Sequence, residues 1–260
     1  MDLDLPASMF RAGATEEKVT IQVPRKNFLE PVNRDATFTE IDGLAIFEGD
    51  ILLGKAEDVR GTTDPGPKGI GIPGAQYRWP NGIVPYVIGS EIVRPRVLNA
   101  IAHWQSKTPI RFVERQNQQD YISFQALNGC YSQIGRRGGM QIISLGAGCS
   151  VGAAIHEIGH ALGLWHEQSR SDRDQYVRII LENIAPKARH NFDQRILDGM
   201  DLGSYDYESI MHYPATAFSI NGQPTIVTAQ ANQPIGQRNG LSNGDIAAIR
   251  VLYPNLAWPS

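Results

Sequence analysis

The chain has 260 residues, of which 42% are hydrophobic and 20% are charged. This composition is typical of a folded globular protein, and the length allows one large domain or two small ones. The net charge of −3 argues against a broad basic surface of the kind that binds nucleic acid. No apolar run reaches the roughly 18 residues needed for a membrane span. The opening has no basic stretch followed by an apolar one, so we expect no secretory signal there.

The first part of the chain differs in composition from the rest. Residues 1 to about 58 contain a short candidate strand at 16–24 and too few large apolar side chains to close a core of their own. Residues 60–76 are dense in glycine and proline, which is typical of an exposed linker that proteases cut. We therefore divide the chain into a leading segment, 1–70, which ends in a cleavable linker, and a main domain, 71–260.

The main domain begins with strands and ends with helices. Its predicted strands lie within residues 77–89, 110–115, 120–127 and 140–145. A first helix is indicated by the spacing of Val97, Ile101 and Trp104. Further helices, the last with Ser242 as its N-cap, are expected at 150–166, within 186–200 and within 241–254. Because the predicted strands lie mostly in the first half of the main domain and the helices mostly in the second, we expect an α+β fold.

The two cysteines, Cys130 and Cys149, lie in residues 128–152, a stretch that reads as one strand between glycine-rich turns. Two cysteines are too few for a disulfide scaffold, and their spacing leaves two alternatives, one disulfide or two buried thiols. A disulfide here would contribute about 3 kcal/mol on the chain-entropy view.

Residues 153–168, AAIHEIGHALGLWHEQ, hold three of the six histidines. On a helix His156 and His160 lie on one face and can share a metal ion, while Glu157 lies one step round and can reach a water on that metal. Gly163 accepts positive φ, so the helix can end there and His166 can return as a third ligand. Three neutral imidazoles leave a position open for water, which is typical of catalytic zinc.

A lone H-E-x-x-H occurs by chance, and the alternative interpretation is a set of ordinary buried histidines. The added Gly163 and His166 at fixed offsets make chance a poor explanation, and the full pattern is the zinc motif of the metzincins. This pattern predicts hydrolysis through a zinc-bound water whose pKa the metal lowers to about 7. Glu157 would take the proton from that water and pass it to the leaving amine.

Glu167 after the third histidine and SIMHY at 209–213 together resemble the astacin family of metzincins. From about Tyr77 to Pro254 the family order continues through WPNGIVPYVI, TPIRFVER, GCYSQIG, YDYESIMHY and LSNGDIAAIRVLY. The resemblance implies a zinc endopeptidase whose two lobes flank a cleft. A twisted mixed sheet and two long helices would form the first lobe, and a mostly irregular second lobe would carry the last helix. A protein or peptide substrate would add as a strand to an edge strand at 135–145.

The resemblance also implies roles for single residues. Met211 would lie in a Met-turn beneath the metal without binding it. Tyr213 would be an extra zinc ligand that later donates to the oxyanion, the alternative being a core tyrosine. Glu167 would hold the amino terminus of the mature chain, the alternative being a surface glutamate. The arginines near the edge strand could favour acidic substrates or could simply be solvated; they are Arg136 and Arg137.

FEGD at 47–50 resembles the F-x-G-D motif of astacin propeptides. It implies that residues 1–70 are a propeptide and that the Asp50 carboxylate occupies the metal position needed by water. This aspartate switch would keep the enzyme latent, as a zymogen, until an activating protease cuts within 60–74. Gly49 would let the backbone approach the cleft closely. The alternative is an ordinary Gly-Asp turn between strands.

The sequence departs from the family at one disulfide. Cys130 and Cys149 match the inner of the two usual bridges, but Pro109 stands where the first cysteine of the other is expected. The expected bridge and the family habit predict a secreted, extracellular protein. The alternative function is a zinc-binding adhesion module of the same fold that no longer cleaves; the presence of Glu157 and Tyr213 argues against it.

Overall fold

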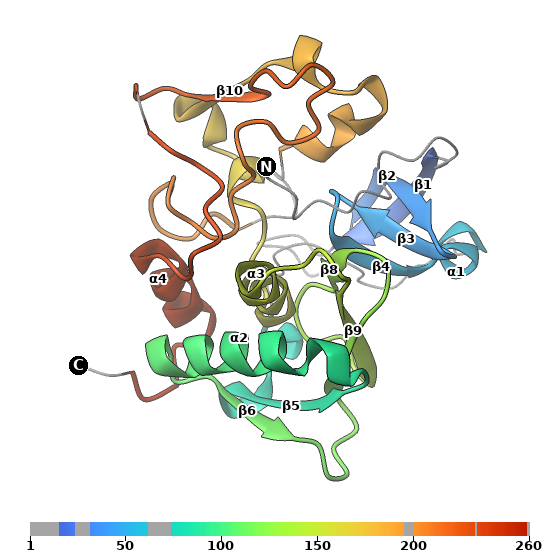
Figure 1. Cartoon of the computed structure of the whole chain (residues 1–260), viewed down its shortest axis with the longest axis vertical. Helices are drawn as coiled ribbons and strands as arrows, with labels where there is room; N and C mark the ends of the chain where they lie inside the picture. The colour runs from blue at the N-terminus through green and yellow to red at the C-terminus, as the bar shows by residue number, and fades with distance from the viewer. Residues whose placement is uncertain (1–15, 24–31, 62–73, 195–199, 232, 259–260) are drawn as a thin grey trace.

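A computed structural model describes residues 16–23, 32–61, 74–194, 200–231 and 233–258 (Figure 1). The first four strands belong to the leading segment and are β1 (Glu16–Val23), β2 (Val32–Ile41), β3 (Leu44–Phe47) and β4 (Ile51–Lys55). The strands of the main domain are β5 (Ile83–Ile88), β6 (Arg111–Glu114), β7 (Tyr121–Gln125), β8 (Cys130–Ser132), β9 (Met140–Leu145), β10 (Val177–Ile179) and β11 (Ile226–Thr228).

Four α-helices accompany the strands in the described residues: α1 (Ala56–Gly61), α2 (Arg94–Lys107), α3 (Val151–Leu162) and α4 (Asn243–Leu252). The 3-10 helices are Ala75–Tyr77, Pro80–Gly82, Glu91–Val93, Glu167–Ser169, Arg173–Gln175, Leu181–Asn183 and Pro186–Phe192. None of the described helices is long and apolar enough to cross a membrane.

One mixed sheet of nine strands joins the leading segment to the main domain in the order β1-β2-β3-β4-β8-β9-β7-β5-β6. The leading strands pair antiparallel with one another, and β4 then pairs parallel with β8 where Ile51 meets Ser132. Beyond β8, which is antiparallel to β9, the remaining strands run parallel. Figure 1 shows this blue leading sheet beside the end of the yellow-green α3.

The described part of the leading segment shares its core with the main domain. Its buried side chains include Phe38, Phe47 and Leu53, and the same cluster takes in Tyr77 and Ile134 from the main domain. This agrees with the sparse apolar content of the segment, because burial of its apolar surface depends on those partners. The linker at 60–76 lies mostly outside the described residues, which omit 62–73.

The first lobe of the main domain holds the larger core, and α2 and α3 pack together within it (Figure 1). The apolar face predicted on α2 is buried at Val97, Ile101 and Trp104. The Trp104 indole donates to the Ile155 carbonyl oxygen at 3.1 Å and so ties α2 to α3. The two long helices and the mixed sheet of the predicted α+β fold are confirmed.

The second lobe is mostly irregular, as expected. It contains 3-10 turns, the antiparallel pair β10-β11, and α4. Ser242 caps α4 as predicted, because its hydroxyl accepts from Asp245 N at 2.9 Å while the Asp245 carboxylate accepts from Ser242 N at 2.9 Å. The Tyr253 hydroxyl donates to the Leu162 carbonyl oxygen at 3.1 Å, which joins the ends of α4 and α3.

Four expectations about single strands and helices were wrong. Residues 128–152 form two strands, because the glycine-rich turn at 135–139 reverses the chain between β8 and β9. The expected edge strand therefore lies inside the sheet, and β8 is the strand that meets the leading segment. The helix predicted at 150–166 ends at Leu162, and the one within 186–200 is a 3-10 helix that ends at Phe192, with residues 195–199 outside the described part.

The predicted disulfide is present. Cys130 and Cys149 are bonded, with their Cα atoms 5.9 Å apart. The bridge ties the start of β8 to the turn immediately before α3, whose N-cap is Ser150. It therefore fixes the strand beside the leading segment against the beginning of the helix that carries the first two histidines.

Replacing both cysteines, as Cys130→Ala with Cys149→Ala, should lower the free energy of unfolding by about 3 kcal/mol, because the bridge closes a loop with a sequence separation of 19. Denaturant titration of the wild type and the double variant measures the difference. Wild-type protein in a thiol reductant is the control and should show the same loss. An unchanged unfolding midpoint would contradict this role.

Candidate metal centre

The three histidines of the motif converge because of where α3 ends. Ser150 caps the helix by accepting from Ala153 N at 3.0 Å, and the helix then carries His156 and His160 one turn apart. Gly163 ends it at φ 108°, a left-handed conformation that suits glycine, and the chain turns back. His166 returns so that its ring centroid lies 5.5 Å from that of His156 and 4.8 Å from that of His160.

Each imidazole is held at Nδ1, which turns Nε2 toward the other two. His156 Nδ1 lies 2.8 Å from the Ile210 carbonyl oxygen, and His160 Nδ1 lies 2.9 Å from the Leu164 carbonyl oxygen. A carbonyl oxygen only accepts, so Nδ1 carries the hydrogen in both rings and Nε2 keeps its lone pair. His166 Nδ1 lies 3.1 Å from a carboxylate oxygen of Glu48. Such outer contacts orient imidazoles for a metal.

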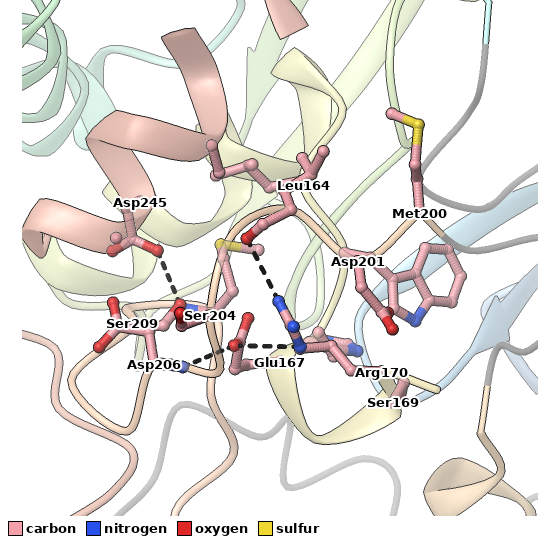
Figure 2. Close-up of a pocket in the computed structure, with 16 residues that line it drawn as sticks. Leu164, Glu167, Ser169, Arg170, Met200, Asp201, Ser204, Asp206, Ser209 and Asp245 are labelled. Carbon is pink, nitrogen blue, oxygen red and sulfur yellow. Dashed lines mark hydrogen bonds and ion pairs between the residues drawn. The ribbon is translucent and has the colours of Figure 1, made fainter. Parts of the chain in front are cut away.

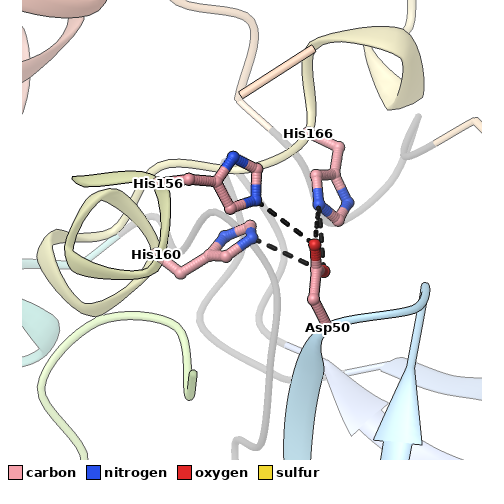
Figure 3. A group of neighbouring side chains, drawn as sticks. All are labelled: Asp50, His156, His160 and His166. Carbon is pink, nitrogen blue, oxygen red and sulfur yellow. Dashed lines mark hydrogen bonds and ion pairs between the residues drawn. The ribbon is translucent and has the colours of Figure 1, made fainter. Parts of the chain in front are cut away.

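Asp50 from the leading segment faces all three imidazoles (Figure 3). Its Oδ2 lies 3.3 Å from His156 Nε2 and 3.2 Å from His166 Nε2, and its Oδ1 lies 3.6 Å from His160 Nε2. One ligand atom from each of the four buried residues falls within 4.8 Å of the others. The predicted ligands of the latent form are thus brought together in one cluster.

The charge of each group in this cluster depends on its neighbours. Burial alone would raise the pKa of Asp50, but the imidazoles, His166 above all, hold it well below its usual range. Burial lowers the pKa of His156 to about 3 and also lowers that of His160, so both rings are neutral. Burial would lower the pKa of His166 too, but Asp50 and Glu48 outweigh it and raise this pKa to about 9.

A divalent cation fits this group. Two of its buried atoms, Asp50 Oδ1 and His160 Nε2, make no hydrogen bond with the described residues, although each has a partner of the cluster nearby. A cation between them would compensate both lone pairs. Three imidazole nitrogens and one carboxylate oxygen match the four-coordinate donor set that zinc prefers.

Glu157 lies on α3 directly after His156 and is buried, with 1% of its surface exposed. A buried glutamate beside a metal group has to be compensated by its surroundings, because an isolated carboxylate in the interior is costly. Its position on the helix that carries two of the three histidines agrees with the predicted neighbourhood of the catalytic base.

Met211 is buried, packs against α3, and lies in a turn that α4 holds. A Cβ added to Gly159 of α3 would lie 2.7 Å from the Met211 sulfur, so only glycine there allows this close packing. The turn is fixed by Asp245 of α4, whose carboxylate accepts from the Ser209 hydroxyl at 2.7 Å and from Ile210 N at 3.0 Å. Sequence reasoning missed Asp245, although its place three residues after the Ser242 cap was a usable signal.

Tyr213 is engaged by the leading segment. Its hydroxyl donates to the Glu48 backbone carbonyl oxygen, and its ring centroid lies 4.7 Å from that of His166. Glu48 therefore contacts both a histidine of the cluster and the tyrosine. Sequence reasoning noted the motif that contains Glu48 but gave this residue no role, because the motif itself leaves the position unspecified.

Glu167 lines a cavity of about 50 Å³ next to the cluster (Figure 2). One of its oxygens accepts from Asp206 N at 2.8 Å and lies 3.6 Å from Arg170 Nε. Burial raises the pKa of Glu167 to about 8, although Arg170 opposes the shift. Glu167 is thus a partly buried residue that lines a cavity and not a surface glutamate.

The two arginines near the sheet are not simply solvated. Arg136 forms an ion pair with Asp120 and donates to the carbonyl oxygens of Gln76 and Arg78. The guanidinium of Arg137 lies 5.4 Å from the centre of the Tyr77 ring. Both side chains anchor the beginning of the main domain, so the solvated interpretation was wrong.

Comparisons with known proteins agree with this site. Residues 72–254 match the family described as Astacin (Peptidase family M12A). The chain is 48% identical over 178 residues to High choriolytic enzyme 1 of Oryzias latipes, covering 66% of each chain. It is 42% identical over 221 residues to Meprin A subunit beta of Homo sapiens, covering 81% of this chain and 30% of that one.

The fold agrees as well. A solved structure of High choriolytic enzyme 1, described as a hatching enzyme zinc-protease of the medaka fish, superposes with a TM-score of 0.64 at 46% identity. It covers 68% of this chain and 92% of that chain.

The family match covers well over half of the chain, so the protein belongs to the astacin family of zinc metallopeptidases. Membership confirms the predicted family, fold, metalloendopeptidase class and zinc cofactor. The aligned part spans just under two thirds of High choriolytic enzyme 1 and 30% of Meprin A subunit beta.

Zinc analysis tests the cluster. The wild type should hold one zinc ion per chain, and His160→Ala should lose this stoichiometric metal, because it removes one of the three imidazole ligands. Elemental analysis after gel filtration gives the ratio. His190→Ala, which changes a histidine outside the cluster, is the matched control and should keep the metal. Full zinc retention by His160→Ala would contradict this ligand set.

Proposed function

We propose that the protein is a latent zinc endopeptidase that hydrolyses peptide bonds of protein substrates. The observation that carries the proposal is the convergence of His156, His160 and His166 on the Asp50 carboxylate of the leading segment. Family membership supports the reaction class, and the buried position of Glu157 on the same helix supports the presence of a base.

The proposed chemistry divides among the residues of the site. When bound by the three histidines, zinc supplies a Lewis acid that activates water and polarises a carbonyl group. Glu157 takes a proton from the attacking water and delivers it to the amine that leaves. Tyr213, once free of the Glu48 carbonyl, donates a hydrogen bond to the oxyanion. Met211, which packs against Gly159 on the helix of His156 and His160, would form an apolar floor beneath the metal position.

Latency follows from the occupation of the site by the leading segment, residues 1–70. Asp50 takes the place where water is needed, and the Glu48 carbonyl holds the Tyr213 hydroxyl. The β4 strand also pairs with β8, so the strand on which an extended substrate could add is already covered. We propose that a second protease cuts within 60–74 and frees residues 71–260 as the catalytic domain.

The bridge between Cys130 and Cys149 supports a protein that works outside the cytosol, because disulfides persist in oxidising compartments. Secretion is therefore part of the proposal. The substrate is an extended peptide segment that binds along β8 through main-chain hydrogen bonds, with side-chain pockets setting preference.

Activation can be tested with a quenched-fluorescence peptide library. The intact chain should cleave no peptide, and the chain cut within 60–74 should cleave peptides and lose this activity when a metal chelator is added. In the intact chain Asp50→Ala should give measurable activity, because water then reaches the metal position, but less than in the cut chain, because β4 still covers β8. Asp58→Ala, which changes an exposed acidic residue on α1, is the matched control and should stay silent.

Glu157→Ala in the cut chain should lower kcat by about 10²- to 10⁴-fold, the usual contribution of a general base. If the cut, zinc-loaded chain cleaves no member of the library and Glu157→Ala changes nothing, the peptidase proposal fails, and the binding module takes its place.

We further propose that Glu167 receives the new amino terminus after the cut. The cavity beside Glu167 supports this, because Met200 lines both that cavity and a groove that contains Gly74 and Ala75. The ammonium group of the new terminus would pair with the partly buried Glu167 carboxylate, whose pKa is raised although Arg170 lies nearby.

In the cut chain, Glu167→Gln should lower the melting temperature, because it removes one partner of a partly buried ion pair. The intact chain should change less, since glutamine can still accept from Asp206 N and Arg170 keeps its ion pair with Asp172. Glu182→Gln, an exposed change, is the control for both forms. Equal melting temperatures for cut wild type and cut Glu167→Gln would rule out this role.

A further inference from the structure

Glu48 is fully buried and makes three contacts with the main domain. Its carboxylate lies 3.1 Å from His166 Nδ1 and accepts from the Ser169 hydroxyl at 3.3 Å. Its backbone carbonyl accepts from the Tyr213 hydroxyl. The residue has φ 43°, a left-handed conformation that a non-glycine residue adopts at some energetic cost. The turn is therefore held in a conformation that sends both Glu48 and Asp50 into the site.

The outer contact of His166 differs in kind from those of the other two histidines. His156 and His160 use backbone carbonyl oxygens of the main domain itself, from Ile210 and Leu164, and removal of the leading segment leaves these in place. His166 uses a carboxylate, and that carboxylate belongs to the leading segment. One ligand of the metal thus depends on a residue that activation removes.

A carboxylate that accepts from the far nitrogen of an imidazole fixes the tautomer and the ring orientation and makes the near nitrogen a stronger donor. We propose that Glu48 is a positioning residue for the metal, which acts through His166 and raises the zinc affinity of the intact chain. The leading segment then both blocks the metal and raises its affinity for the protein, so removal of the segment lowers the zinc affinity. This inference rests on the zinc site of the proposed function.

The test measures zinc affinity by competition with a chromophoric chelator, on the intact chain. All proteins carry Glu157→Ala, so that no self-cleavage changes the sample. Adding Glu48→Ala should weaken zinc binding by about 10- to 100-fold, the usual effect of losing such a partner. Glu48→Gln keeps an accepting oxygen without the charge and should fall between the two. The control is Glu40→Gln, a leading-segment carboxylate that pairs with Arg60, and it should leave the affinity unchanged.

A second experiment separates the effect of Glu48 on zinc affinity from that of Asp50. In an Asp50→Ala background, Glu48→Ala should weaken zinc binding by the same factor, because it acts on the opposite nitrogen of His166. The gain in melting temperature on adding zinc gives an independent readout, and it should shrink with Glu48→Ala while the metal-free melting temperature reports on folding. If Glu48→Ala does not fold, the intermediate affinity of Glu48→Gln carries the test.

Zinc affinity within twofold of the parent for both Glu48 variants would overturn the inference, as would an effect that vanishes in the Asp50→Ala background. A parent chain that binds no stoichiometric zinc would overturn the metal site of the proposed function, and this inference with it. Stoichiometric zinc that is indifferent to Glu48 would overturn the inference alone.

Discussion

The arrangement of this protein depends on one constraint, the burial of a carboxylate among three imidazoles. Asp50 and Glu48 are both removed from water, and an isolated buried carboxylate is unstable unless cations or hydrogen bonds compensate it. Here His166 lies between the two carboxylates, and the remaining nitrogens face the position of a metal cation. The histidine cluster therefore compensates the buried carboxylates of the docked leading segment, and the cluster in turn gains a carboxylate partner.

The rest of the fold supports the two sides of that contact. On the main-domain side, α3 is held by its Ser150 cap, by the bridge beside it, and by Trp104 from α2. The Met211 turn is tied to the start of α4 through Asp245. On the leading side, β4 extends the sheet at β8. Its apolar residues pack on Tyr77 and Ile134. Both partners are thus positioned by packed elements before any substrate arrives.

The sequence predicted what depends on short-range geometry. The period of an α-helix places His156 and His160 on one face, and a glycine at 163 ends that helix, so the histidine cluster could be predicted. The N-cap at Ser242 and the bridge between Cys130 and Cys149 were predicted correctly too, the bridge through the family resemblance. Family resemblance also indicated Asp50, although it lies 106 residues from His156.

Long-range pairing could not be predicted in the same way. The strand next to the leading segment is β8 and not the expected β9, because the turn at 135–139 reverses the chain between them. No local sequence pattern predicts the direction of that turn. The contacts of Arg136 with Asp120 and two backbone carbonyls, and those of Glu48 with His166 and Tyr213, join residues far apart in the chain. Such contacts come from tertiary packing, which overrides local preference.

The central claim is that Asp50 and the three histidines share one zinc ion in the intact chain. An anomalous-difference map from crystals of the intact, zinc-loaded protein tests it most directly. We expect one peak within about 2.0–2.2 Å of Nε2 of His156, His160 and His166 and of a carboxylate oxygen of Asp50. A zinc ion bound by the three histidines and a water molecule, with the Asp50 carboxylate turned away from it, would contradict this claim.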